Sequence, residues 1–201
     1  MEYKIKNLRK LTLLALMTQF IFISSCSSDG PVMEQPEQIY YDLAQRRMKA
    51  NNYFSAIESL QAIETNYPFG RYAEQAQSEL IYAYYMNGED EASHEAAEKF
   101  IRLNPRHPNI DYAYFMRGIS SYTRDKGIFA RVFKRDLSDR DISGAKQAFG
   151  ELSEFLTRFP QSQYAPYASQ RLIYLRALIA KNELVVAEYY LRRKAYVAAL
   201  R

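Results

Sequence analysis

The chain of 201 residues is long enough for one domain with a buried core or for a short array of repeats. Apolar residues make up 48% of it and charged residues 25%, a composition that excludes the intrinsically disordered class. Four basic residues against one acidic residue in positions 1–25 supply +3 of the formal net charge of +4, so the remaining chain, at about +1, does not provide the phosphate neutralisation that a nucleic-acid partner requires.

Residues 1–25 have the pattern of an export signal. Basic residues come first, and an apolar run from Leu11 to Ile23 follows them. As a helix, this run reaches about 20 Å at 1.5 Å per residue, which is shorter than the roughly 30 Å hydrocarbon core of a bilayer. The segment is therefore interpreted as a signal peptide and left out of the fold.

The segment Ile23-Ser24-Ser25-Cys26 resembles a bacterial lipobox, in which an aliphatic residue and two small residues precede a cysteine that becomes acylated. Cys26 is the only cysteine of the chain and stands where the apolar run ends, so we predict that it is the lipidation site. Several acyl chains would anchor the protein firmly, because each buried methylene contributes about 0.8 kcal/mol. The alternative is an ordinary signal peptide with a chance cysteine. Residues 26–36 are expected to form a lipidated, flexible tether.

From Pro36 onward, apolar residues recur at helical spacing. Three such stripes run over Ala73–Tyr84, Tyr112–Tyr122 and Leu172–Ile179. The spacing predicts amphipathic helices and almost no strand.

Three prolines follow predicted helices, in Asn66-Tyr67-Pro68, Leu103-Asn104-Pro105 and Arg158-Phe159-Pro160. Proline lacks an N–H and disfavours helix in the residue before it, so each is interpreted as a helix terminator. The pattern aromatic-Pro-x-x-x-Tyr-Ala-x-x-Ala-x-x-x-Leu-Ile-Tyr begins at Tyr67 and begins again at Phe159. The middle copy, from Pro105 to Arg117, is looser and is expected to have a longer turn.

The proline spacing indicates a repeat. Pro68 and Pro105 are 37 residues apart, close to one tetratricopeptide unit of about 34, and Pro105 and Pro160 are 55 apart, which adds an insertion of about 18 residues. We place that insertion at 124–143. The predicted fold is all-α: a tetratricopeptide-like helical repeat solenoid, a right-handed superhelix of antiparallel helix pairs. It covers residues 37–201 in about four units, and the last unit is truncated at Arg201.

Signals for catalysis are weak. The sequence has no HExxH, GxSxG, P-loop or GxGxxG motif. His94 is placed on a polar helix face and His107 in a proline-rich turn, and both are interpreted as structural or solvated. The charged insertion does not match a calcium loop, because the twelfth position counted from Asp136 is Gln147 and not glutamate. We therefore predict that the chain is not an enzyme and holds no cofactor or metal.

Two sets of residues are candidates for binding proteins. The insertion carries Phe129, Arg131, Phe133 and Arg135, which we consider a docking loop for a partner; the alternative is that its balanced charges form local ion pairs of little energetic weight. The aromatic residues around the first proline turn and on the helix after it are candidates for a peptide-binding groove: Tyr67, Phe69, Tyr72, Tyr82 and Tyr85. The alternative for each is core packing.

Several segments carry a resemblance to a known family: Cys26, Tyr67–Gly70, Leu80–Tyr85, Phe100–Pro105, His107–Tyr112, Met116–Gly118, Asp139–Asp141 and Val186–Tyr190. They are similar to segments of the BamD family (YfiO, ComL), the tetratricopeptide lipoproteins of the β-barrel assembly machinery in Gram-negative outer membranes. The similarity covers the whole chain after the signal.

The resemblance implies a lipoprotein of the outer membrane that faces the periplasm. Ser27 agrees with this location, since aspartate after the lipidated cysteine is the usual cue for retention in the inner membrane. The family also implies a scaffold that recognises the aromatic-ending carboxyl-terminal segments of unfolded outer-membrane proteins, docks the POTRA domains of BamA and associates with BamC. Family members continue beyond the position of Arg201, which leaves BamA docking by this chain open. The alternative is a generic tetratricopeptide lipoprotein that coordinates division or peptidoglycan enzymes.

Overall fold

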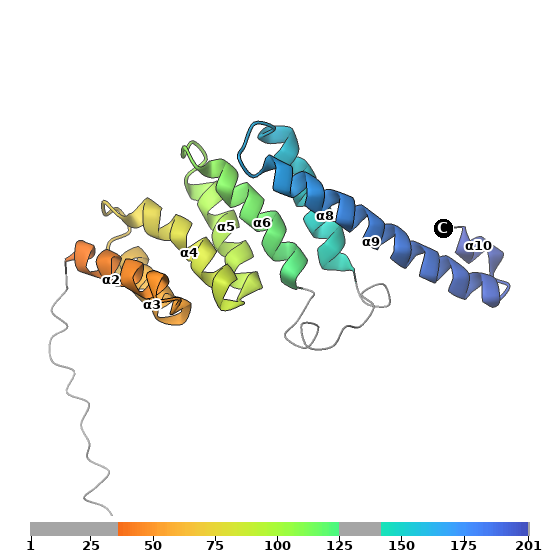
Figure 1. The fold of residues 1–201 in the computed structure, drawn as a ribbon, viewed down its shortest axis with the longest axis horizontal. Coiled ribbons are helices and arrows are strands. Elements are labelled where there is room, and N and C mark those ends of the chain that lie inside the picture. Colours follow the sequence, from red (N-terminus) through yellow and green to blue (C-terminus); the bar gives the residue numbers. More distant parts are fainter. Residues whose placement is uncertain (1–35, 125–141, 201) are drawn as a thin grey trace, which may run out of the picture. The chain divides into compact units, whose positions relative to one another are not determined.

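The computed structural model describes residues 36–124 and 142–200, and these residues form helices and turns without any strand (Figure 1). They belong to one compact unit that spans residues 35–201. In chain order the helices are α2 (Glu37–Lys49), α3 (Tyr53–Asn66), α4 (Ala73–Asn87), α5 (Asp90–Leu103), α6 (Ile110–Arg124), α8 (Ser143–Arg158), α9 (Ala165–Arg192) and α10 (Tyr196–Ala199). Cys26 and the insertion residues 125–141 lie outside the described residues.

Consecutive helices pack in pairs, as expected for a tetratricopeptide-like repeat. The pairs are α2 with α3, α4 with α5, α6 with α8 and α9 with α10, and each pair contacts the next one. The first helices of the second and third pairs, α4 and α6, also contact each other directly. The prediction of an all-α helical repeat is confirmed, and the insertion falls between the two helices of the third pair.

The three proline turns share one backbone geometry. Helices α3, α5 and α8 each end two residues before the proline, and the residue that follows each helix has φ between −132° and −124° and ψ between 55° and 58°. In every copy the N–H three residues later donates to the carbonyl oxygen of that capping residue at 2.9–3.1 Å. The expected longer middle turn is wrong, because His107, Pro108 and Asn109 form the same turn from a different sequence.

Three helix pairs are closed by a turn with one residue in the left-handed region: Asn51 (φ 57°), Gly88 (φ 84°) and Lys194 (φ 59°). The residue after each caps the second helix with almost the same angles, φ −92° to −88° and ψ 65° to 72°. Glycine adopts left-handed angles without strain and asparagine does so readily, whereas a lysine has no such preference. The α9–α10 turn therefore repeats the backbone of the earlier turns with a less suitable residue.

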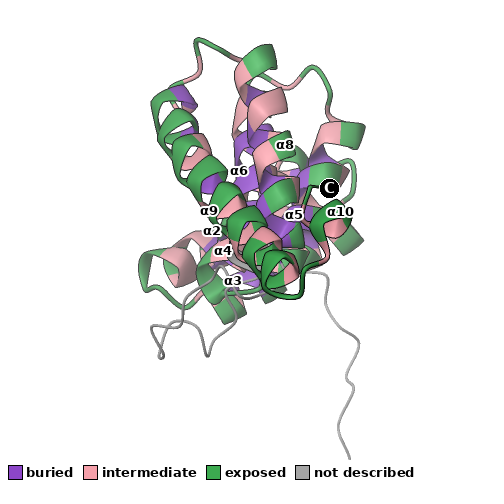
Figure 2. Cartoon of the chain, turned by 90° about the vertical axis from the view of Figure 1, so that its right-hand side faces the viewer, coloured by how far each residue is buried: buried purple, intermediate pink, exposed green. Residues whose placement is uncertain are grey.

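Buried apolar side chains form two clusters along the repeat. The first lies among α2, α3 and α4, and the larger second one extends from α4 to α9. Figure 2 shows the buried residues gathered between α5, α6 and α8. At Gly118, α6 approaches α8 so closely that an added Cβ would lie 2.7 Å from the Cγ of Leu152. Glycine at this position permits the close packing of the third pair.

Helix α9 is 28 residues long, yet its buried residues, Ala165, Ala168 and Leu175, all lie in its first half. Its second half exposes Leu184 and Leu191, and α10 folds back beside its far end (Figure 1). Among the described residues, no helix combines the length and apolarity needed to cross a membrane.

Two carboxylates of the first repeats tie α2 to α4. Glu37 on α2 accepts the backbone N–H groups of Arg71 and Tyr72 at 3.0 and 2.6 Å, so it caps the amino terminus of α4 from another helix. Glu79 on α4 accepts from Tyr41 at 2.9 Å and from the Gln45 amide of α2. These bonds fix the register of α2 against α4, which sets the geometry of the surface described next.

Candidate functional site: an aromatic face on α4, α6 and α9

A hollow of about 370 Å³ opens between the ends of α2 and α3 and the helices α4 and α6. Its walls carry three tyrosine rings, one from each of α3, α4 and α6: Tyr53, Tyr82 and Tyr112. The remaining lining residues are Met48, Lys49, Ser78 and Glu79. The hollow thus offers apolar ring surface together with one ammonium and one carboxylate.

The rings of the hollow are held in place and remain accessible. Tyr53 meets Tyr82 edge to face, with the ring centres 6.0 Å apart, and Tyr82 is 41% exposed. Burial raises the pKa of the Tyr112 phenol above its ordinary value of 10.0, and the nearby Tyr164 adds to this. This shift reflects how closely the ring of Tyr112 is enclosed by its neighbours.

Ring contacts continue this surface from α6 onto α9. Tyr164, just before α9, lies 5.7 Å from Tyr112 and stacks on Phe115 at 4.9 Å, and Phe115 lies 5.7 Å from Tyr167. Further along the same two helices, Tyr122 meets Tyr174 at 5.8 Å. We call the whole set the aromatic face: Tyr53, Tyr82, Tyr112, Phe115, Tyr122, Tyr164, Tyr167 and Tyr174. Phe115 and Tyr122, 8% and 4% exposed, belong to the core and support the other rings from below. The exposed rings of the face are those of Tyr82, Tyr167 and Tyr174.

The four tyrosines and one phenylalanine proposed from the sequence as peptide-binding residues do not lie together in the structure. Tyr67 is half-buried with its ring 6.5 Å from Tyr40, and Tyr72 stacks on Tyr41 at 4.4 Å. Phe69 is fully exposed at the tip of the turn between them. All three lie near the amino-terminal end of α4.

Only Tyr82 lies on the aromatic face. It is ten residues after Tyr72 on α4, about 15 Å along a helix. Tyr85 is half-buried and packs against the larger core cluster, which agrees with the alternative of core packing for that residue.

Two residues of the aromatic face that were not proposed from the sequence, Tyr164 and Tyr174, could have been found by aligning the two copies of the repeat. Tyr82 and Tyr174 are the last residues of the two matching Leu-Ile-Tyr segments, and both are exposed, at 41% and 44%. Tyr72 and Tyr164 are likewise equivalent in the two copies, although only Tyr164 belongs to the aromatic face. Aligning the two copies therefore identifies Tyr174 on α9 as the residue equivalent to Tyr82.

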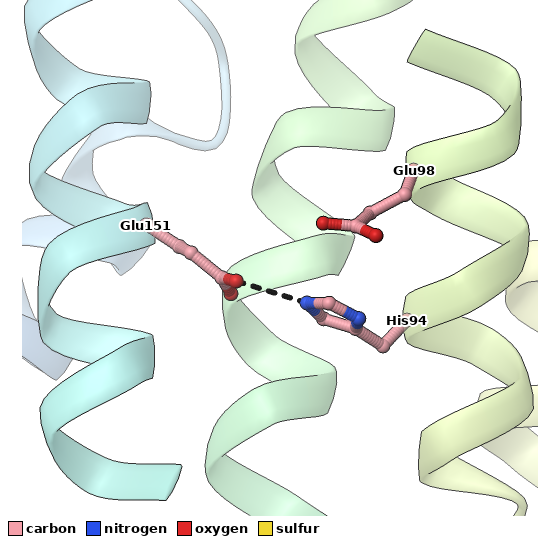
Figure 3. A group of neighbouring side chains, drawn as sticks. All are labelled: His94, Glu98 and Glu151. Carbon is pink, nitrogen blue, oxygen red and sulfur yellow. Dashed lines mark hydrogen bonds and ion pairs between the residues drawn. The ribbon is translucent and has the colours of Figure 1, made fainter. Parts of the chain in front are cut away.

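A polar cluster links α5, α6 and α8 (Figure 3). Nε2 of His94 on α5 lies 2.9 Å from Oε1 of Glu151 on α8. Ser121 of α6 donates to the other oxygen of Glu151 at 2.7 Å, and Gln147 donates to Oε1 at 3.0 Å. His94 is only 6% exposed, so of the two roles expected from the sequence, structural or solvated, it has the structural one, as a link between repeats.

The two members of this pair shift each other's pKa toward the charged forms. The hydrogen bond with Glu151 raises the pKa of His94 above 6.5, against the opposing effect of burial. Burial disfavours ionisation of Glu151, but its bonds with His94, Ser121 and Gln147 together hold its pKa below 4.5. His94 and Glu151 therefore form a charged pair in mildly acidic solution.

Glu98 lies one helical turn beyond His94 and turns its carboxylate toward the pair (Figure 3). One potential ligand atom from each of these three side chains lies within 4.8 Å of the others. A metal ion would have to replace the bonds that already satisfy Glu151, so we interpret the cluster as a link between helices. His107 is also structural: its ring packs edge-on against Phe100 at 5.1 Å.

The sequence resembles known proteins over almost its full length. Residues 33–201 match the family YfiO, described as an outer membrane lipoprotein. The chain belongs to the YfiO family. This confirms the family resemblance inferred from the sequence segments.

Several YfiO relatives are named outer membrane protein assembly factor BamD. The protein from Vibrio cholerae is 36% identical over 189 residues, which cover 94% of this chain and 78% of the relative. The protein from Neisseria meningitidis serogroup A is 35% identical over 185 residues, 88% of this chain and 69% of the relative. The protein from Xylella fastidiosa Temecula1 is 38% identical over 194 residues, 93% of this chain and 65% of the relative.

Proposed function

We propose that this chain is an outer membrane protein assembly factor that works by binding other proteins and catalyses no reaction. The observation that carries the proposal is the aromatic face, which runs across the first helices of three successive repeats in a family whose relatives are named assembly factors. Helical repeats bind extended partners along such surfaces, because each repeat adds a similar contact at a regular spacing.

The ligand that fits this face is an extended segment of an unfolded outer-membrane protein, in particular its aromatic-ending carboxyl terminus. A strand destined for a β-barrel alternates apolar and polar side chains and has unpaired backbone groups. Tyrosine suits such a ligand, because the ring packs on apolar side chains while the hydroxyl bonds to the backbone. Tyr82 and Tyr167 are 41% and 50% exposed, so a ligand can contact both the ring and the hydroxyl of each.

The remaining parts of the proposal concern attachment and partners. Cys26 would carry the lipid that holds the protein on the periplasmic side of the outer membrane, and Phe129, Arg131, Phe133 and Arg135 of the insertion would contact a partner protein. The POTRA domains of BamA and the lipoprotein BamC are the partners that the family suggests. These residues lie outside the described residues, so the support for this part comes from the sequence and the family alone.

A peptide-binding measurement tests the proposal. A labelled peptide from the carboxyl terminus of an outer-membrane barrel protein is titrated with the purified full chain, and binding is followed by fluorescence anisotropy. Tyr82→Ala should weaken binding by about 1–3 kcal/mol, as expected for an aromatic anchor. Phe54→Ala is the matched control, because Phe54 is an aromatic residue, 64% exposed, that does not line the hollow.

If the wild type and Tyr82→Ala bind the peptide with equal affinity, the aromatic face does not bind it. Tyr67→Ala, measured for both affinity and melting temperature, decides the role of the proline turn. Lost affinity would support the contact proposed from the sequence, and lost stability with unchanged affinity would make Tyr67 a packing residue.

A further inference from the structure

Arg171 on α9 lies within the aromatic face, and its charge is held between two rings. Its guanidinium carbon is 4.7 Å from the ring centre of Tyr122 and 5.5 Å from that of Tyr167. The N–H at Nη2 donates to the Tyr167 hydroxyl at 2.9 Å. These contacts restrict a side chain that is otherwise long and flexible. The guanidinium is thus positioned before any ligand binds.

The electrostatic situation of Arg171 differs from that of comparable arginines. Among the arginines whose side chains the structure describes, three are half-buried: Arg47, Arg117 and Arg171. Arg47 has the Glu58 carboxylate at 3.8 Å and Arg117 has the Glu154 carboxylate at 2.6 Å. Arg171 has ring and hydroxyl contacts but no carboxylate at ion-pair distance within residues 36–124 and 142–200.

A cation that is partly removed from water without an anionic partner is suited to receive an anion from a ligand. The planar guanidinium can donate two parallel hydrogen bonds to one carboxylate. Beside it, Tyr167 and Tyr174 are 50% and 44% exposed and follow one another along the same face of α9. The site therefore combines a carboxylate receptor with accessible ring surface within two helical turns.

We propose that Arg171 binds the α-carboxylate of a peptide whose last residue is aromatic, and that the last ring packs against Tyr167 and Tyr174. A chain terminus fits better than an acidic side chain, because the terminal residue carries both the carboxylate and the ring. This inference rests on the proposed function and adds the direction in which the peptide lies along the aromatic face. The rings of Tyr167 and Tyr112 are linked through the buried Phe115 and the half-buried Tyr164, and Tyr112 lines the hollow together with Tyr82. We therefore place the residues upstream of the terminus toward Tyr82.

The test uses two peptides of identical sequence that end in phenylalanine, one as the free acid and one as the carboxyl-terminal amide. Both are titrated against the full chain as the wild type, Arg171→Gln and Arg171→Lys. Arg176→Gln is the matched control, because Arg176 is an exposed arginine of the same helix. The wild type should bind the acid at least about tenfold more tightly than the amide, since a charge-assisted pair is lost in the amide.

In Arg171→Gln the affinity for the acid should fall to that for the amide, while the amide binds as it does to the wild type, which shows that the face is still folded. Arg171→Lys should keep only part of the preference for the acid over the amide, because lysine cannot donate two parallel hydrogen bonds to one carboxylate. A wild type that binds both peptides equally, or an acid preference that survives in Arg171→Gln, overturns the inference, while the effect of Tyr82→Ala on either peptide still supports peptide binding. If neither peptide binds the wild type, the proposed function fails, and the inference fails with it.

Discussion

Replacing His94 by alanine perturbs the link between repeats at its centre. The change leaves the Glu151 carboxylate, whose side chain is 13% exposed, with only the neutral donors Ser121 and Gln147. Removing one member of a buried ion pair costs about 3–5 kcal/mol. Because the two neutral donors continue to stabilise the carboxylate, we expect a loss of about 2–3 kcal/mol in the free energy of unfolding. For a unit of this size, that lowers the melting temperature by roughly 4–12 °C.

The size of the effect should depend on pH in a defined way. The pKa of His94 is raised, so its contribution to stability is fully present below pH 6.5 and is lost as the pH rises through the folded-state value. The pKa of Glu151 is lowered, so its contribution is present above pH 4.5 and is lost as the pH falls through its folded-state value. The pair therefore contributes most between pH 4.5 and 6.5. Glu98 and Arg117 also act on His94, in opposite directions.

Thermal unfolding followed by circular dichroism across this pH range measures the difference between the wild type and His94→Ala. The gap in melting temperature should be largest in the mildly acidic window and should narrow on both sides of it. Glu95→Ala, an exposed residue of the same helix, should change stability by less than about 0.5 kcal/mol at every pH. A gap that is constant with pH, or larger at pH well above 6.5, would refute the charged pair.

Three further substitutions test the packing. Gly118→Ala should destabilise the protein by about 1–3 kcal/mol in urea unfolding, because its Cβ would lie 2.7 Å from Leu152; an unchanged midpoint would mean that α6 and α8 have room to separate. Glu37→Gln should cost about 0.5–1.5 kcal/mol, since the charge that caps α4 from α2 is removed, and an effect that does not shrink in high salt would argue against that electrostatic role. Lys194→Gly should stabilise the α9–α10 turn by about 1 kcal/mol, seen as slower hydrogen exchange in α10, whereas faster exchange would contradict strain at φ 59°.

The helix ends could be predicted because their causes are local. Proline at 68, 105 and 160 acts on the residue before it, and the same backbone turn results in all three copies. The middle turn shows the limit of this reasoning: a looser sequence does not imply a different backbone. His107 makes the same two backbone hydrogen bonds as Gly70 of the first turn: its N–H donates to the capping residue, and its carbonyl accepts from the first residue of the next helix.

The faces of single side chains could not be predicted in the same way. Tyr82 and Tyr85 are three residues apart, which separates them by about 60° around a helix. That angle is small enough to count as one face in a sequence, yet Tyr82 lines the hollow and Tyr85 packs on the core, because α4 has neighbours on both sides. His94 depends on Glu151, which is 57 residues away, so a polar local sequence gave no sign of its burial.

Crosslinking in living cells tests most directly whether the aromatic face meets unfolded outer-membrane proteins. A photo-crosslinking amino acid is placed at Tyr82, or at the exposed Leu103 on α5 as the control, and newly synthesised barrel proteins are labelled in a short pulse. The proposed function predicts crosslinks from position 82 to unfolded barrel proteins that disappear during the chase, and few from position 103. Equal crosslinking from both positions, or none from position 82 in a protein that is folded and localised correctly, would contradict it.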